Sequence, residues 1–525
     1  GGDINNASGR TPDRSCFAAA IKACGDAGRW EEAAGLLEKM SAAGVDPDVA
    51  VYNEVISAHA NGGKWREALT ILFEEMPAAG VAPNAVSYGA AMHACGEGGE
   101  GERAVELLRG MSAAGIAPGV IGYNTAIAAC GAGGRWQEAV GLLREMPGSG
   151  DRVRPDIRSY TAAIKACRIA RRWEPAVALL RASVRAGLQP DVVLYQEVLS
   201  ACAGSGRWKE AIALLGEMPA AGVNPNAFSY NAAIAACAEE QWERAAALLE
   251  EMPAAGITPS AYSYNSVINA FRHGGQWQRA VSLLREMVRV GVVSPDEVTF
   301  SSAIAACGAC GQWEQAVALL RAMPALHVPP TVTVYKAAMK ACGDAGRWRE
   351  VESLLEEMAA AGVTPDADSY GIAIKANGDA GQRRGALALL REMETAGVRA
   401  DASSYNAAIA ACGIAGTWEE GVSLLRKAAA AGVAPDVIGY TAAIKACGDA
   451  GQWEESLALL REMPGAGVKP TARSFAAAIG ACERSGQLDY SAALLKQMRE
   501  EGFVPDEFVE TACEVSGEVL GPACG

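Results

Sequence analysis

The chain has 525 residues, half of them hydrophobic, and its formal net charge is −15. No stretch approaches the roughly 20 consecutive apolar residues that a membrane-spanning helix needs, so we expect no membrane partner. The acidic total argues against a uniformly basic surface that binds nucleic acid, although two faces of an elongated protein can differ in the sign of their charge. The first residue is Gly, and we expect any targeting peptide to lie upstream of it.

A block of about 35 residues recurs fourteen times between Arg14 and Asp506, as a comparison of 17–48 with 440–471 illustrates. Most units have 35 residues, with single units of 34 and 37 and two of 36. A unit this short is unable to bury a core alone, whereas stacked units share one continuous core and form a solenoid. We therefore expect an irregular leader at 1–13, fourteen tandem repeats at 14–506, and a partial helix with a tail at 507–525.

Each unit predicts two helices, as the unit 437–471 illustrates. Apolar residues at helical spacing predict a first helix over 438–448, which the Gly-Asp-Ala-Gly segment 448–451 ends. A second apolar stripe predicts a second helix, which we expect Pro464 and Gly467 to end. The stripe consists of Trp453, Leu457, Leu460 and Met463.

Tryptophan begins the second helix in eleven units, which accounts for every tryptophan in the chain. Such regular placement predicts inter-helix core rather than a base-stacking site. Eleven of the fifteen cysteines also share one repeat position, which is typical of packing residues and not of disulfide or metal pairs. So many single thiols favour a reducing compartment. The eleven are Cys24, Cys95, Cys130, Cys167, Cys202, Cys237, Cys307, Cys342, Cys412, Cys447 and Cys482.

The sequence contains no recognisable catalytic constellation. Its four histidines lie in different repeats, without an acid or nucleophile at matching spacing. Cys307 and Cys310 form a lone Cys-x-x-Cys pair that no second pair or nearby His completes as a zinc site. We therefore expect no enzyme activity, no metal and no cofactor. The histidines are His59, His93, His273 and His327.

Two positions vary inside an otherwise monotonous unit: the residue after the aromatic of the first helix, and the residue after the Pro that closes the unit. Both are mostly small and polar, and both lie at the entrance to a first helix. Asp, Asn, Ser and Thr cap helices well, which explains the closing position. Capping does not explain why Asn or Thr so often follows a core aromatic.

The unit lacks the Trp-Leu-Gly-Tyr pattern of tetratricopeptide repeats. It has an aromatic at position four, a turn near position fourteen, Leu-Leu-x-x-Met in the second helix and a closing Gly-Val-x-Pro-Asp. These features resemble the pentatricopeptide repeat family in its plain 35-residue form, over residues 14–506. The resemblance implies an all-α fold, a right-handed α-solenoid superhelix of stacked helix-turn-helix repeats. It also implies a location in a plastid or mitochondrion.

In that family the two variable positions read one RNA base per repeat. An Asn amide offers donors and an acceptor to a pyrimidine edge, whereas Thr or Ser leaves room for a purine. The N-terminal repeat meets the 5′ end of the RNA, so repeats four to eight imply the core U-G-x-C-U. The resemblance implies uracil for Asn124 with Asp156, Asn265 with Asp296 and Asn406 with Asp436, guanine for Thr161 with Asp191, cytosine for Asn231 with Ser260, and a pyrimidine for Asn53 with Asn84. Ser301 and Thr441 complete the implied base-reading set.

The resemblance further implies that an apolar side chain at position two of a unit packs against each base. These side chains are Val86, Ile121, Val193, Phe228, Tyr262, Val298 and Ile438. Arg158, Asp368 and Arg473 occupy the same position in other units and are poor packing surfaces for a base. The units with Gly89, Gln196, Lys336 or Gly371 at the reading position, and the two end repeats with Ala there, receive no base assignment.

A Lys follows the reading position by four residues in five units, on the same helix face. It is either a phosphate contact or an ordinary solvated side chain, and the sequence weights the two equally. The five are Lys22, Lys165, Lys340, Lys375 and Lys445.

These observations lead to the hypothesis of sequence-selective single-stranded RNA binding without catalysis. The protein would act as a monomer in organellar RNA stabilisation, processing, splicing or translation, with the involvement of protein cofactors left open. The alternative is a protein-interaction scaffold or structural subunit of an organellar assembly, since solenoids also offer long surfaces for partner peptides and the acidic total favours this class.

Overall fold

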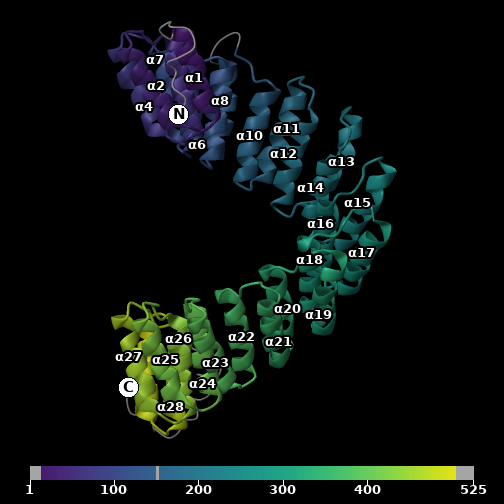
Figure 1. Cartoon of the computed structure of the whole chain (residues 1–525), viewed down its shortest axis with the longest axis vertical. Helices are drawn as coiled ribbons and strands as arrows, with labels where there is room; N and C mark the ends of the chain where they lie inside the picture. The colour runs from purple at the N-terminus through teal and green to yellow at the C-terminus, as the bar shows by residue number, and fades with distance from the viewer. Residues whose placement is uncertain (1–12, 149–152, 292, 504–525) are drawn as a thin grey trace, which may run out of the picture. The chain divides into compact units, whose positions relative to one another are not determined.

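The computed structural model describes residues 13–148, 153–291 and 293–503. Within these ranges the chain folds into fourteen pairs of helices and contains no β-strand, so the fold is an all-α repeat solenoid (Figure 1). The described helices include none that is both long and apolar enough to cross a bilayer. The expected tail 507–525 and all but the last residue of the expected leader 1–13 lie outside the described ranges.

The first helix of each pair begins directly after the closing residue of the preceding unit. These helices are α1 (Arg14–Asp26), α3 (Val49–Asn61), α6 (Ala85–Glu97), α8 (Val120–Ala132), α10 (Ile157–Ile169), α12 (Val192–Ala203), α14 (Ala227–Cys237), α16 (Ala261–His273), α18 (Glu297–Ala309), α20 (Val332–Asp344), α22 (Ala367–Asp379), α24 (Ala402–Ile414), α26 (Val437–Asp449) and α28 (Ala472–Arg484).

The second helix begins with tryptophan in most pairs. These helices are α2 (Trp30–Ala42), α4 (Trp65–Thr70) with η1 (Ile71–Glu75) and α5 (Met76–Ala78), α7 (Gly101–Ala113), α9 (Trp136–Glu145) with η2 (Met146–Gly148), α11 (Trp173–Arg185), α13 (Trp208–Ala220), α15 (Trp242–Ala254), α17 (Trp277–Val290), α19 (Trp313–Ala322) with η3 (Pro324–Leu326), α21 (Trp348–Ala360), α23 (Arg383–Thr395), α25 (Trp418–Ala430), α27 (Trp453–Gly465) and α29 (Leu488–Glu500).

Local hydrogen bonds explain where the helices begin and end. Asp436 precedes α26, and its Oδ1 accepts from the backbone N–H of Gly439 at 2.9 Å, which caps the helix. After Asp449 the chain turns at Gly451, whose φ of +75° suits glycine, and the N–H of Gln452 donates to the Cys447 carbonyl at 2.8 Å. The first helix therefore runs one residue beyond the predicted 438–448 at each end.

The prediction that Pro464 ends the second helix is wrong, because α27 continues through it to Gly465. The fixed φ of proline is close to the helical value, and near the end of a helix its ring removes only one backbone donor. The helix ends at Gly465, and the chain turns away two residues later at Gly467, whose φ is +76°. The same arrangement recurs at Pro219 in α13 and Pro253 in α15.

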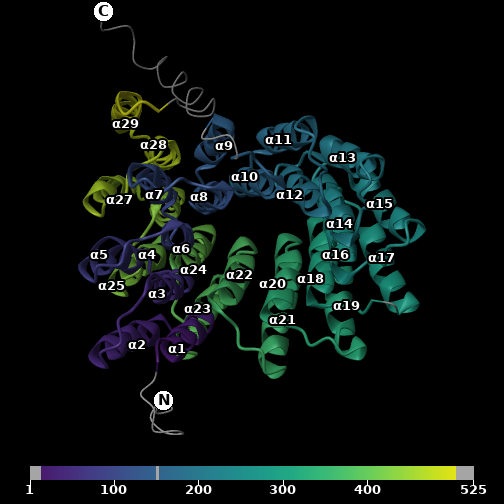
Figure 2. The same cartoon turned by 90° about the horizontal axis from the view of Figure 1, so that it is seen from above.

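The chain divides into two compact units, Gly1–Ala270 and Phe271–Gly525. In the first unit each first helix packs on the first helix of the next repeat, as in the series α8, α10, α12 and α14. Figure 2 shows α10, α12 and α14 forming one row, with α11, α13 and α15 in a second row beside it. In the second unit α20, α22, α24, α26 and α28 pack in the same succession. Each unit is thus two layers of helices around a shared core.

The core of each repeat is built from the same few side chains. In the fifth repeat Tyr160, Ile164 and Cys167 of α10 and Leu180 of α11 are buried, with no measurable exposure at Ile164 and Cys167. Burial of one such aliphatic side chain contributes about 1.5–3 kcal/mol. The cysteine prediction is confirmed for ten positions, which are buried as free thiols, while Cys24 is half-buried. The ten are Cys95, Cys130, Cys167, Cys202, Cys237, Cys307, Cys342, Cys412, Cys447 and Cys482.

The eleven tryptophans are half-buried, so the prediction that they belong to the core is wrong. Each begins the second helix of its repeat, and the rings of Trp30 and Trp65 cover the turns of the next repeats at Gly62 and Gly98. A Cβ added to Gly62 would lie 2.5 Å from Cδ1 of Trp30, which shows how closely the ring covers this turn. Cations of the next repeat lie over several of these rings, as with Arg207, whose Cζ lies 5.0 Å from the Trp173 ring. These tryptophans therefore join successive repeats.

The eleventh repeat contains an internal weak point at Asn377, which takes the place of the buried cysteine. Its side chain is fully buried, and Nδ2 donates to the Ala373 carbonyl at 3.1 Å. Among the described residues its Oδ1 has no hydrogen-bond partner. A buried unsatisfied oxygen costs about 1–3 kcal/mol.

We expect Asn377→Cys to raise the thermal midpoint and to slow amide exchange in α22, because the substitution removes the unsatisfied oxygen. Calorimetry and hydrogen exchange measured by mass spectrometry report both effects. Cys447→Asn, which introduces the same group into the thirteenth repeat, is the matched control and should be destabilising. Unchanged or faster exchange in α22 of the Asn377→Cys protein would contradict this account.

Candidate nucleic-acid interface

The second residue of the first helix presents an exposed apolar side chain in seven repeats. The exposed fraction of these side chains ranges from 46% for Val193 to 81% for Ile121, and the other five are Val86, Phe228, Tyr262, Val298 and Ile438. They make up seven of the fourteen large hydrophobic side chains that are exposed within the described ranges. Apolar side chains left in water at one repeat position indicate a contact surface for another molecule.

The predicted reading residues lie three positions further along the first helices, five of them in these seven repeats and the rest in others. Asn53, Asn124, Thr161, Asn231, Asn265, Ser301, Asn406 and Thr441 are each the fifth residue of a first helix, and apart from buried Asn53 all are half-buried. The closing residues Asn84, Asp156, Asp191, Ser260, Asp296 and Asp436 stand directly before the next first helix.

The two variable positions of a unit meet directly in several repeats, and in two of these the pair is Asn with Asp. Asn124 donates from Nδ2 to Oδ1 of Asp156 at 3.2 Å, and Asn406 donates from Nδ2 to Oδ1 of Asp436 at 2.9 Å. These residues are about 30 positions apart in sequence. Successive repeats therefore assemble one polar site from both variable positions of a unit.

The closing residue also caps the next helix, so the capping interpretation is confirmed alongside this contact. Oδ1 of Asp156 accepts from the backbone N–H of Ser159 at 2.8 Å and from its hydroxyl at 2.9 Å. Burial acts to raise the pKa of Asp156, but the hydrogen bonds from Ser159 and Asn124 outweigh it and lower the pKa. The carboxylate is therefore charged near neutral pH and orients the Asn124 amide.

Two of the reading asparagines have a side-chain carbonyl oxygen that lacks a hydrogen-bond donor among the described residues. Oδ1 of Asn124 and Oδ1 of Asn231 are buried, and neither accepts a hydrogen bond from any described residue. Asn53 differs, because its Oδ1 accepts from the Ser87 hydroxyl at 2.6 Å. Buried acceptors are usually satisfied, so an unsatisfied amide oxygen repeated at one position suits a ligand that brings an N–H.

The threonines at the same position are engaged within their own helices. Thr161 donates to the Ile157 carbonyl at 2.8 Å, and Thr441 donates to the Val437 carbonyl at 2.6 Å. Asp191 and Asp296 cap α12 and α18 through backbone N–H groups, each at 2.8 Å. The sequence-based pairing of Thr161 with Asp191 therefore remains a prediction about a bound state.

The five predicted phosphate contacts are exposed, and none of them forms an ion pair with a described residue. Four have an Asp four residues later on the same helix face, which reduces the local positive charge. The exception is Lys165, which Ile169 follows at that spacing. The compensated lysines and their acids are Lys22 with Asp26, Lys340 with Asp344, Lys375 with Asp379, and Lys445 with Asp449.

Some cations on the second helices, or directly before them, are paired with carboxylates. Arg135 donates to Oε2 of Glu102 at 2.8 Å and also pairs with Glu138, while Lys427 pairs with Glu394 at 2.8 Å. Surface pairs of this kind contribute at most about 1 kcal/mol each, but they consume positive charge.

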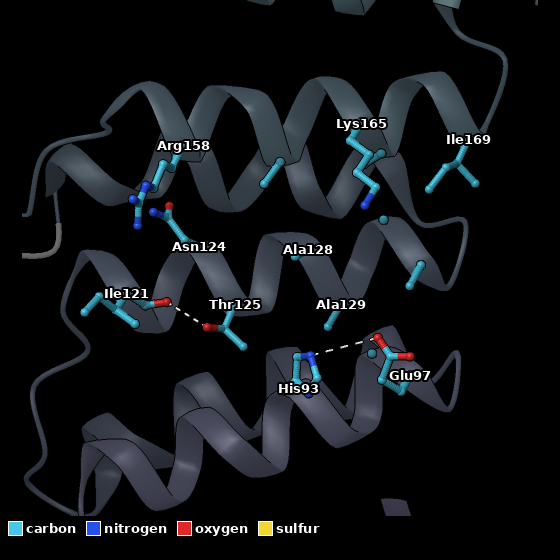
Figure 3. Close-up of a pocket in the computed structure, with 15 residues that line it drawn as sticks. His93, Glu97, Ile121, Asn124, Thr125, Ala128, Ala129, Arg158, Lys165 and Ile169 are labelled. Carbon is cyan, nitrogen blue, oxygen red and sulfur yellow. Dashed lines mark hydrogen bonds and ion pairs between the residues drawn. The ribbon is translucent and has the colours of Figure 1, made fainter. Parts of the chain in front are cut away.

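A cavity of about 540 Å³ lies on this face across α6, α8 and α10. Its lining includes Ile121, Asn124, Arg158, Lys165 and Ile169, with Lys165 reaching from α10 toward α8 (Figure 3). His93 lines the same cavity, and its Nε2 lies 3.9 Å from Oε1 of Glu97. An apolar cavity with a few convergent polar groups is the usual form of a ligand site.

The sequence-based prediction missed Arg158, which it treated as unsuited to packing against a base. The structure places its side chain in the cavity beside Asn124, and it makes no ion pair with any described residue (Figure 3). A planar guanidinium can stack on a base and attract phosphate at the same time. The sequence did contain a signal for Arg158. It is the second residue of the repeat that follows the repeat of Ile121, and neighbouring repeats share a site.

The lone Cys-x-x-Cys pair has a structural explanation. Cys307 is buried in the core of α18, and the thiol of Cys310 donates to the Gly275 carbonyl at 3.4 Å. The described part of the chain holds no group of His, Cys, Asp or Glu side chains arranged to bind a metal ion.

Family models for this kind of repeat match most of the chain. The model of the PPR repeat family matches 190–239 and 263–309, and that of the pentatricopeptide repeat domain matches 35–98 and 72–135. The PPR repeat model matches 15–45, 121–151, 298–328 and 333–363. The model of the pentacotripeptide-repeat region of PRORP matches 380–516. No curated protein sequence matches the chain.

Solved structures share the fold. The crystal structure of the pentatricopeptide repeat protein PPR10 from maize matches with a TM-score of 0.67 and 23% identity, over 96% of this chain and 76% of that chain. The structure of PPR10 in complex with an 18-nt psaJ RNA element matches with a TM-score of 0.52 and 21% identity, over 97% and 83% of the two chains. With the matching repeat models and the fourteen helix pairs, these findings show that the chain belongs to the pentatricopeptide repeat family.

Proposed function

We propose that this protein binds single-stranded RNA sequence-selectively, with bases seated at positions two and five of successive first helices. The observation that carries the proposal is the cavity around Asn124, where an exposed apolar side chain, an unsatisfied amide oxygen and two unpaired cations converge. Each group has a counterpart in a nucleotide: the base face, the base edge and the phosphate. The shared fold with PPR10, whose complex contains an 18-nt RNA element, supports the proposal.

The geometry around Asn124 favours a pyrimidine edge. One N–H of its Nδ2 is directed to Asp156, so the other remains for a ligand, next to the unsatisfied Oδ1. The N3–H and O4 of uracil present a donor beside an acceptor, which complements this amide. Uracil is therefore the base proposed for the fourth repeat, within the core U-G-x-C-U proposed for repeats four to eight.

The proposed mode of action is occupancy of the RNA without chemistry. A bound segment is protected from nucleases, held out of secondary structure or presented to another factor. From the family resemblance we also propose a location in a plastid or mitochondrion.

We expect Asn124→Ala to weaken binding of a U-containing target RNA by about 5- to 150-fold, which corresponds to the roughly 1–3 kcal/mol of one bidentate base contact. The same variant should lose the difference in affinity between that RNA and one with A in place of the contacted U. Fluorescence anisotropy with labelled RNA measures both quantities. Gln137→Ala, which removes an exposed amide from α9 of the same repeat, is the matched control and should bind like the wild type. Equal affinity of Asn124→Ala and wild type for the U-containing RNA would refute the base-reading role.

A further inference from the structure

We propose that repeats ten and eleven do not read bases, so that the array contacts RNA in two tracts separated by an unread gap. This inference rests on the proposed RNA binding and concerns its specificity. The gap lies at the contact of α20 with α22, within the second compact unit.

An internal ion pair fills the reading site of the tenth repeat. Lys336, the fifth residue of α20, places its Nζ 2.9 Å from Oδ2 of Asp366 and 2.9 Å from Oδ2 of Asp368. Asp366 also caps α22, with Oδ1 accepting from the N–H of Ser369 at 2.9 Å and from its hydroxyl at 2.7 Å. Hydrogen bonds that the ammonium donates to the two carboxylates raise the pKa of Lys336, which keeps the ammonium charged. Both variable positions of this unit are therefore satisfied without a base.

The same site in the fourth repeat has the opposite electrostatic character. Arg158 contributes a cation at position two of the following repeat, whereas Asp368 places a carboxylate there with its side chain 71% exposed. Ile169, at the end of α10, corresponds to Asp379 at the end of α22. Carboxylates repel the phosphates of RNA, and an Asp side chain lacks a broad apolar or planar surface for a base.

The eleventh repeat adds a second unreadable position. Its reading residue is Gly371, which has no side chain, and a Cβ placed there would meet only the Ser404 hydroxyl at 3.6 Å. Its closing residue Asp401 is engaged in capping α24, with Oδ1 accepting from the N–H and hydroxyl of Ser404, both at 2.8 Å. A base opposite this repeat meets no amide or hydroxyl at the fifth position.

Readable sites resume in the twelfth repeat. Asn406 contacts Asp436 in the same way as Asn124 contacts Asp156. Ile438 is exposed at position two of the following repeat, the place that Arg158 has next to the fourth repeat. The nucleotides opposite repeats ten and eleven therefore bridge two tracts, and their base identity is not selected.

An abasic scan of a selected target RNA tests the gap with the wild-type chain. Single abasic nucleotides are placed along the RNA, and affinity is measured by fluorescence anisotropy. We expect a loss of about 10-fold or more at the U opposite repeat four and less than 2-fold at the sixth and seventh nucleotides on its 3′ side. A 10-fold loss at those two nucleotides, or a preference for guanine opposite Lys336, overturns the gap. Absence of binding to every RNA refutes the proposed function itself, which separates the two failures.

A gain-of-reading variant provides an independent test. Lys336→Asn combined with Asp368→Ile reproduces the side chains that Asn406 and Ile438 contribute to the twelfth repeat. We expect the double variant to bind RNA with U opposite repeat ten about 10-fold more tightly than RNA with A there, whereas the wild type binds both equally. Lys336→Asn alone, which leaves the carboxylate of Asp368 in place, is the control and should gain less. An unchanged U-to-A ratio in a folded double variant contradicts the role assigned to the ion pair.

Discussion

Reversing the two unpaired cations of the cavity, by Arg158→Asp with Lys165→Glu, should lower the affinity for single-stranded RNA by about 100-fold at low salt. Each cation contributes to neutralising phosphate, and loss of two phosphate contacts should reduce the slope of log K against log salt by about 1.4. Arg158 also loses its stacking surface for the base. Anisotropy titrations at several salt concentrations give both the affinity and the slope.

A matched control separates local contacts from net charge. Arg181→Asp with Lys39→Glu changes the net charge by the same amount, but these exposed residues lie on the second helices α11 and α2. We expect the control to bind RNA within about 3-fold of the wild type, because exposed charges more than a Debye length of about 10 Å from the RNA are screened. Equal losses in the two double variants would contradict a local cation site and indicate a nonspecific charge effect.

The thermal midpoint should fall steeply above pH 9, because ten buried thiols resist ionisation in the folded protein. Burial raises the pKa of Cys95, Cys130 and Cys167 to about 11, and of Cys202 and Cys342 to about 12. Thiols in the unfolded chain titrate near 8.5. Each thiol has a higher pKa in the folded protein than in the unfolded chain. Its contribution to stability is therefore complete below the pKa of the unfolded chain, and it is lost as the pH rises toward the pKa of the folded protein. The loss is about 1.4 kcal/mol per thiol for each pH unit in this window.

Calorimetry between pH 7 and pH 10 measures this decline. Tyrosines such as Tyr195 and Tyr230 also have pKa values raised by burial, but they titrate above about 10, so the interval from pH 9 to pH 10 isolates the thiols. A variant with Cys95→Ala, Cys130→Ala and Cys167→Ala should show a shallower decline in that interval, although its midpoint at pH 7 is lower. A midpoint that stays constant from pH 8 to pH 10 would contradict ionisation-resistant thiols.

The repeat period and the helix pairs could be predicted from the sequence because the apolar spacing and the positions of glycine indicate the same helices. Apolar spacing defined both helices, and glycines with positive φ end them as expected at Gly451 and Gly467. Pro464 was misjudged because proline signals a helix end in sequence, while its backbone conformation is helical and one missing donor is tolerated in the last turn. Errors of this kind move a boundary by a few residues and leave the fold unchanged.

The site was less predictable, because its parts come from different repeats. The two variable positions of a unit could be identified by their variation, yet the contact of Asn124 with Asp156 depends on how α8 packs on α10. Arg158 was discounted when its own repeat was considered alone, and only packing places it in the cavity of the preceding repeat. The half-buried tryptophans were misassigned for a related reason, since regular spacing predicts contact but not how much of the ring that contact covers.

Selection of RNA from a randomised single-stranded pool, followed by anisotropy at two salt concentrations, tests the central claim most directly. The account predicts enrichment of a U-G-x-C-U core with affinity that falls as salt rises, followed on the 3′ side by nucleotides without base preference. Failure to bind any RNA even at low salt would contradict the account and favour the alternative of a protein-interaction scaffold.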